Sequence, residues 1–154
     1  MKKYLLTALI AFGVVLPAKA TPTVEALFAA IRATGTSIVV DAPRICNKSK
    51  DMLGMYEYQK NVIDQLTICI HNHGGNSAEV FDTLLHESVH IAQACNGGYL
   101  FKPETIVKEA LPKEILTVSN LYPNAQFSTE LEARVIARQQ DEVYVTELIK
   151  EHCK

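Results

Sequence analysis

His86-Glu87-Ser88-Val89-His90 is the stretch of this chain that decides most about its fold. Apolar residues recur around it at helical spacing, and in a helix residues i and i+4 lie on the same face. His86 and His90 can therefore offer two imidazole nitrogens to one metal ion. Glu87 lies about 100° further round the helix axis and can reach a water molecule beside that ion. Two neutral nitrogen ligands suit zinc, and a neighbouring carboxylate suits the general base of a metal-dependent hydrolase.

The segments around this motif predict an α+β chain with a small antiparallel or mixed sheet packed on the motif helix. We predict that this helix covers residues 77–95 and ends at Gly97 and Gly98. The segment before it, residues 62–70, alternates apolar and polar positions and predicts a strand. Other predicted elements are helices at 23–34, 103–120 (two pieces broken at Pro112) and 128–150, strands at 36–41 and 52–58, and a loop at 71–76.

A third metal ligand is expected from the acidic start of the last predicted helix, because hydrolytic zinc sites usually have three protein ligands. We favour Glu130, which shares a helical stripe with the small residues Ala133 and Ala137. Glu132 is the alternative, although with Thr129 it can form a capping box at the helix start. Both glutamates could instead be solvated residues favoured by the helix dipole.

This plan resembles the gluzincin zinc metallopeptidases, in which H-E-x-x-H lies on one helix and a glutamate lies on a following helix. The resemblance rests on His86, Glu87, His90 and the segment Glu130-Leu131-Glu132-Ala133. It implies a zincin-like fold, one Zn²⁺ held by His86, His90 and Glu130, and hydrolysis of peptide bonds with Glu87 as general base. Arg134 departs from the family pattern, since many relatives carry an acidic or amide residue there.

The first twenty residues have the pattern of a secretory leader. Lys2 and Lys3 precede an apolar run at 5–16, and Ala18-Lys19-Ala20 forms a small-x-small cleavage site. We predict a signal peptide over residues 1–20, cleavage after Ala20, and export to the periplasm or the medium. Residues 21–154 are expected to form a single metallopeptidase-like domain.

The charge balance limits the partners of this chain. Removing the three leader lysines lowers the basic count from 15 to 12 against 17 acidic residues, which gives a formal charge of −5. That charge argues against nucleic acid and against an anionic membrane surface as partners. We expect a monomer that acts on a peptide or protein substrate.

Four cysteines remain after the leader, and an even count in an exported chain predicts two disulfides. Three pairings are possible, and we favour Cys46–Cys69 with Cys95–Cys153. The first would join two neighbouring strand-like segments, and the second would join the motif helix to the C-terminal helix. A cysteine-based metal site is disfavoured because the chain has no C-x-x-C pair.

Several other residues are candidates for supporting roles. Gln93, close after His90, can orient an imidazole or can be a polar residue of the rim. The strand at 62–70 can pair with an extended substrate if it lies at a sheet edge, and it can equally be an internal strand. The candidates for an oxyanion-stabilising group, by residue type alone, are Tyr99, Tyr122, His71 and His73. The two histidines are most simply surface residues, and His152 is expected to be exposed.

Three functional hypotheses follow from these features. The first is an exported zinc-dependent peptidase, and the second is a non-catalytic metal-binding or interaction domain on a zincin-like scaffold. The third, a disulfide-stabilised binding protein without metal, requires the motif to be accidental. Glu87 favours the enzyme, because a purely structural zinc site has no need of a carboxylate between its histidines.

Overall fold

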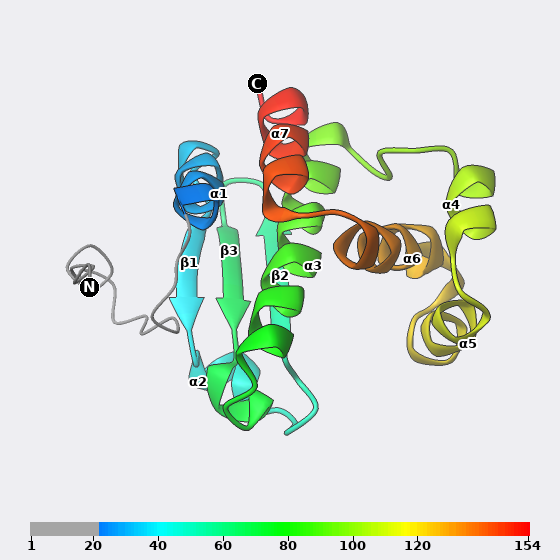
Figure 1. Ribbon diagram of the computed structural model, residues 1–154. Coiled ribbons are helices and arrows are strands. Elements are labelled where there is room, and N and C mark those ends of the chain that lie inside the picture. Colours follow the sequence, from blue (N-terminus) through cyan, green and yellow to red (C-terminus); the bar gives the residue numbers. More distant parts are fainter. Residues whose placement is uncertain (1–21) are drawn as a thin grey trace, which may run out of the picture.

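A three-stranded mixed sheet forms one layer of the structure, a computed structural model that describes residues 22–154 (Figure 1). The central strand β3 (Ile63–Ile68) runs parallel to β1 (Ser37–Val40) and antiparallel to β2 (Gly54–Gln59). The predicted α+β class with a mixed sheet is confirmed. Of the two positions considered for the strand at 62–70, the structure shows the internal one, because β1 and β2 occupy the two edges. The signal peptide predicted over residues 1–20 lies outside the described residues.

The other described elements are helical. They are α1 (Pro22–Ala33), α2 (Pro43–Cys46), the 3₁₀ helix η2 (Ile70–His73), α3 (Ser77–Asn96), α4 (Pro103–Glu109), α5 (Pro112–Leu121), α6 (Asn124–Gln139) and α7 (Glu142–His152). The 3₁₀ turn thus takes up part of the loop predicted at 71–76. None of the helices between residues 22 and 154 is long and apolar enough to cross a lipid bilayer.

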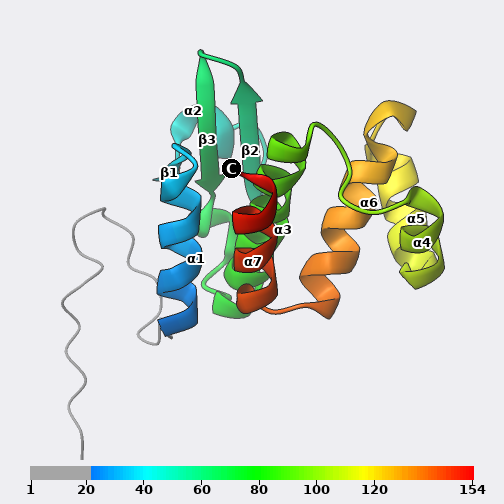
Figure 2. The same ribbon diagram turned by 90° about the horizontal axis from the view of Figure 1, so that it is seen from above.

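The single helix predicted over residues 128–150 is wrong, because two helices, α6 and α7, occupy this region. Gln140 adopts an extended conformation after α6. The carboxylate of Asp141 then accepts a hydrogen bond from the backbone N–H of Tyr144 and caps the start of α7. The break lets α7 return along α3, as Figures 1 and 2 show.

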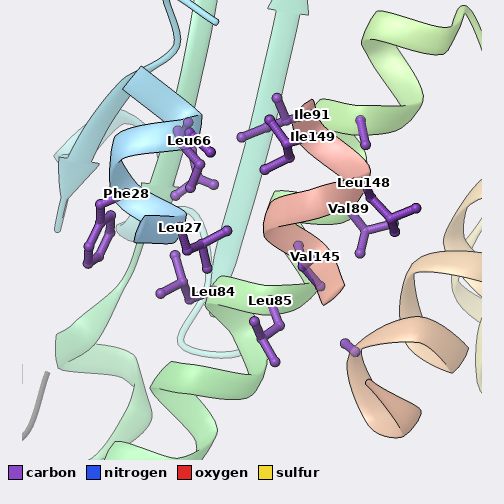
Figure 3. Close-up of a cluster of buried hydrophobic side chains, with 14 of the residues drawn as sticks. Leu27, Phe28, Leu66, Leu84, Leu85, Val89, Ile91, Val145, Leu148 and Ile149 are labelled. Atoms are coloured by element: carbon purple, nitrogen blue, oxygen red, sulfur yellow. The ribbon is translucent and has the colours of Figure 1, made fainter. Parts of the chain in front are cut away.

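Helices α1, α3 and α7 cover one face of the sheet and enclose the main core (Figures 1 and 2). Figure 3 shows Leu27 of α1, Leu66 of β3, Val89 and Ile91 of α3, and Ile149 of α7 converging there. These five side chains are almost completely buried. Each such burial stabilises the folded state by about 1.5–3 kcal/mol, so this core holds α3 firmly against the sheet.

Helix α6 connects this core to a second apolar cluster. Leu131 and Val135 pack with Ile106 of α4 and Val118 of α5. Ala133 and Ala137 point the other way, into the core that contains α3. Small side chains at these positions let the two helices approach closely, as the sequence predicted.

Two disulfides join distant parts of the chain, and both favoured pairings are confirmed. Cys46 at the end of α2 bonds to Cys69 after β3, and Cys95 in the last turn of α3 bonds to Cys153 after α7. The bridged residues are 23 and 58 positions apart. In the chain-entropy model, loops of these lengths stabilise the fold by about 3 and about 4 kcal/mol.

Candidate metal centre

The helix that carries the histidines, α3, has well-defined ends. The side chain of Asn76 accepts hydrogen bonds from the backbone N–H groups of Ala78 and Glu79 and caps the first turn. Gly97 has a φ of 77°, a left-handed conformation that glycine adopts without strain, and it ends the helix. His86 and His90 therefore lie in the rigid middle of α3.

Three predicted ligand atoms converge between α3 and α6. Nε2 of His86 lies 3.2 Å from Nε2 of His90. The Glu130 carboxylate places Oε2 at 3.5 Å from the His86 nitrogen and Oε1 at 3.6 Å from the His90 nitrogen. All three residues offer a ligand atom within 4.8 Å of one another. The structure thus brings together the three side chains that the sequence proposed as ligands.

The spacing of these atoms fits a small divalent cation. Zinc binds nitrogen and oxygen at about 2.0–2.2 Å with tetrahedral angles, so adjacent ligand atoms should lie about 3.3–3.6 Å apart. The separation of the two histidine nitrogens, 3.2 Å, is just below this range, and each carboxylate oxygen of Glu130 lies within it, at 3.5 or 3.6 Å from one of these nitrogens. Oε2 of Glu130 is also one of two buried side-chain atoms in residues 22–154 that have no hydrogen-bond partner. A cation at this point would satisfy that oxygen.

The same three groups shift each other's pKa values in the metal-free chain. Burial alone would raise the pKa of Glu130, but contacts with His86 and His90 outweigh it and lower the pKa to about 2. Burial alone would lower the pKa of His90, but Glu130 and Glu87 outweigh it and raise the pKa to about 9. The Glu130 carboxylate is therefore charged at neutral pH, and in the metal-free chain the raised pKa of His90 favours the protonated ring beside it.

Gln93 fixes the orientation of the His90 ring. Its side-chain Nε2 donates to the backbone oxygen of Thr129 at 2.9 Å and to Oε2 of Glu132 at 2.7 Å. Oε1 of Gln93 must then face His90, whose Nδ1 donates to it at 2.7 Å. This bond leaves Nε2 of neutral His90 free to bind a metal. Of the two roles left open for Gln93, the structure shows the orienting one, because the side chain is buried and bonded to the ring.

Glu132, the alternative ligand, has a different role. Its carboxylate is fully buried and accepts hydrogen bonds from Gln93 and from the backbone N–H groups of Leu100 and Phe101. The capping box predicted with Thr129 is wrong, because α6 begins five residues earlier, at Asn124. Glu132 instead holds the chain that leaves α3 against α6.

Glu87 lines a cleft beside the three candidate ligands. The cleft has a volume of about 520 Å³, and His86 and Glu87 form part of its wall. Glu87 is mostly buried, with 8% of its surface exposed, and its charge contributes to the raised pKa of His90. The cleft is bounded by four parts of the chain: the approach to β2, the middle of α3, α5 with Tyr122, and the second half of α6.

Gly54, at the start of β2, allows the sheet to approach α3 at this cleft. A Cβ at this position would lie 2.6 Å from Cγ2 of Thr83 and 3.0 Å from Cγ of Glu87. The sequence marks this glycine as a weak point in a strand, whereas the structure shows a close contact that excludes a side chain. Gly54 therefore helps to define where Glu87 lies.

Tyr122 and Arg134 line the same cleft. Burial raises the pKa of Tyr122, the charges of Glu130 and Glu87 raise it further, and a hydrogen bond with Arg134 acts in the other direction. The phenol is therefore protonated at neutral pH and lies near both carboxylates. Of the four oxyanion candidates, Tyr122 is the one that the structure brings to the site.

The other candidates lie elsewhere. Tyr99 is half exposed, and His71 is an exposed residue that pairs with Asp41. The expectation that His73 is a surface residue is wrong, because η2 turns it inward, where it bonds to the Cys69 carbonyl and to Oγ1 of Thr83. None of the three lines the cleft. His152, expected to be exposed, is partly buried and bonds to Asn96.

Comparison with known proteins places the chain in one family. The model of the family described as "Domain of unknown function (DUF8637)" matches residues 25–154. The chain therefore belongs to this family. No curated protein and no solved structure matches it.

Proposed function

We propose that this protein is an exported, zinc-dependent peptidase with a zincin-like fold. The observation that supports the proposal most is the convergence of His86, His90 and Glu130 at zinc-like spacing, with Glu87 beside them in the wall of a cleft. Two disulfides fit an oxidising compartment outside the cytosol, as export requires.

The residues divide the proposed chemistry among them. His86, His90 and Glu130 would hold the ion and leave one position open. When bound, Zn²⁺ supplies a Lewis acid that polarises a carbonyl and lowers the pKa of water. Glu87 accepts a proton from the attacking water and delivers it to the leaving amine, while a C–O bond forms and the C–N bond breaks. Tyr122 donates its O–H to the oxygen of the carbonyl as negative charge develops there.

The edge strand β2 offers a place for an extended substrate. Leu53 and Gly54 line the cleft on that side, and β2 has β3 as its one partner in the described sheet. A peptide that pairs with the free edge of β2 would run past Glu87. This arrangement replaces the substrate position considered for the central strand.

The proposal is tested with the chain lacking residues 1–20, purified in the parent form and as Glu87→Gln. Metal content and cleavage of an unstructured protein are measured in both. We expect zinc in both proteins and cleavage by the parent alone, because a glutamine side chain in place of Glu87 cannot accept a proton. The matched control is Glu79→Gln, which removes an exposed carboxylate from the first turn of the same helix and should cleave normally.

Other outcomes reject the peptidase. Absence of bound zinc from the parent, or equal cleavage by the parent and Glu87→Gln, contradicts it directly. Bound zinc in both proteins with cleavage by neither points to the second hypothesis, a metal-binding domain without catalysis.

A further inference from the structure

Arg134 brings to the cleft a positive charge that forms no ion pair within residues 22–154. Its side chain lines the cleft together with His86 and Glu87. Its Nε is buried and is the second of the two side-chain atoms in residues 22–154 that have no hydrogen-bond partner. Glu130 lies one turn earlier on α6, the usual place for a helical ion pair, but its carboxylate is directed at the two histidines.

The neighbouring arginine shows what a neutralised side chain looks like in the same helix. Arg138 donates from Nε to Glu114 at 2.7 Å and from Nη2 to the backbone oxygen of Glu109 at 2.9 Å. The polar group that acts on Arg134 from across the cleft lining is the uncharged phenol of Tyr122. A partly buried guanidinium without a counter-ion costs free energy, which an incoming anion would recover.

We propose that Arg134 binds a carboxylate group of the substrate, an inference that rests on the proposed peptidase function. A guanidinium fits a carboxylate with two parallel N–H···O bonds. Arg134 follows the ligand Glu130 by four residues, a rise of about 6 Å along α6. Both side chains leave the same face of α6 and both act on Tyr122, so the guanidinium lies near the candidate metal centre, within reach of a carboxylate on the first residue beyond the bond that is cleaved.

Two parts of a substrate can supply a carboxylate at that position. One is the C-terminus of the chain, in which case the protein removes single residues from C-terminal ends. The other is an acidic side chain on the same residue. Among the basic side chains of the cleft, Arg138 is already paired with Glu114 and Lys113 is exposed, which favours Arg134 as the binding point. The carboxylates of Asp51, Asp82 and Glu87 repel an anion from the rest of the lining.

The experiment measures binding to the zinc-loaded Glu87→Gln protein by titration calorimetry, so that turnover is not needed. Three mercaptoacyl amino acid compounds are compared, each with a thiol as metal ligand. One has a free terminal carboxylate, one is the terminal carboxamide, and one is a carboxamide with an aspartate side chain. We expect at least one carboxylate compound to bind about tenfold more tightly than the plain carboxamide.

Two further variants, each made in the Glu87→Gln background, assign the preference to one side chain. Arg134→Met should reduce it to less than about twofold, and Arg134→Lys should retain part of it, because lysine keeps the charge but loses the paired geometry. Lys113→Gln is the matched control, since it removes a positive charge from the same cleft, and it should keep the preference.

The result with the three compounds also identifies the source of the carboxylate. Preference for the free terminus supports the site and assigns a C-terminal substrate, whereas preference for the aspartate compound supports the site and assigns a side chain. Equal binding of all three, failure of all three to bind, or a preference that survives in Arg134→Met overturns the inference. Because zinc loading and cleavage are measured separately, failure of this site is distinguishable from failure of the peptidase proposal.

Discussion

Nε2 of Gln93 donates a hydrogen bond of 2.7 Å to Oε2 of Glu132, a carboxylate with no exposed surface. Glu132 also accepts from the backbone N–H groups of Leu100 and Phe101, so its position is set by the main chain. The position of Gln93 in turn sets the ring of His90. The candidate metal centre is thus tied to the fold through a chain of buried hydrogen bonds.

Replacing Gln93 should weaken metal binding more than it weakens the fold. In Gln93→Met the shape is nearly kept, but Nδ1 of His90 loses its acceptor and the ring is free to turn. We expect zinc affinity to fall about 10–100-fold, measured by competition with a chelator. Gln140→Met, an exposed glutamine after α6, is the control and should bind zinc like the parent. Unchanged affinity in Gln93→Met would show that the ring is held by other contacts.

Replacing Glu132 should weaken the fold itself. Glutamine in its place keeps the volume, but it removes the negative charge and turns one acceptor into a donor that faces other donors. We expect Glu132→Gln to lower the free energy of unfolding by about 3 kcal/mol, measured by urea denaturation of the metal-free protein. Glu151→Gln, which changes an exposed residue of α7, should leave this free energy within about 0.5 kcal/mol of the parent. A stable Glu132→Gln protein would contradict the anchoring role.

The contact between β2 and α3 predicts that a substitution at Gly54 is destabilising and that a second substitution, at Thr83, compensates for it. In Gly54→Ala the new methyl would lie 2.6 Å from Cγ2 of Thr83, and Thr83 cannot easily turn because its Oγ1 is bonded to His73. We expect a loss of about 1–3 kcal/mol in the free energy of unfolding, as is typical of overpacking.

Thr83→Ser removes the obstructing methyl and keeps the hydroxyl. The double variant Gly54→Ala, Thr83→Ser should therefore recover most of the stability that Gly54→Ala loses. Unfolding curves of the parent, both single variants and the double variant give the coupling between the two sites. If the double variant instead loses the sum of the two single-variant losses, the Thr83 methyl is not the source of the strain. The strain would then come from the contact with Cγ of Glu87, which lies 3.0 Å from the position of the new methyl.

The local signals in the sequence were enough to predict the motif helix and the convergence of its two histidines with Glu130, the candidate acidic ligand. Helical periodicity and the i, i+4 spacing place His86 and His90, and the small residues Ala133 and Ala137 correctly indicate which face of α6 meets α3. The role of Glu132 could not be read in this way, because its partners are backbone groups of Leu100 and Phe101, which no side-chain pattern marks.

For two features that the sequence-based prediction missed, the sequence does contain an indication. Asp141 followed by Glu142 is a helix start by composition, and it would have divided the region predicted as one helix at 128–150. The tight packing at Gly54 is one of the known reasons for a glycine inside a strand. The burial of His73 had no local signal, since it depends on a contact with Thr83 on another helix.

The pair of Glu114 and Arg138, which forms part of the cleft lining, should make stability depend on pH. Burial alone would raise the pKa of Glu114, but hydrogen bonds from Arg138 and from the backbone N–H of Leu111 outweigh it, and the pKa is lowered from 4.5. A carboxyl whose pKa is lower in the folded state stabilises the protein above the unfolded-state value. This stabilisation is lost as the pH falls from 4.5 through the lowered pKa of Glu114.

The expected result is a difference between two unfolding curves measured as a function of pH. The parent should exceed Glu114→Gln in free energy of unfolding at about pH 6–7, and the gap should narrow steadily below pH 4.5, because glutamine does not titrate. Glu130, with a pKa of about 2, also loses stabilising free energy as the pH falls. This loss is the same in both proteins, so it cancels when one curve is subtracted from the other. Glu104→Gln, an exposed position in the first turn of α4, should follow the parent throughout. A gap that stays constant down to about pH 3 would mean that the Arg138 contact contributes through packing and not through charge.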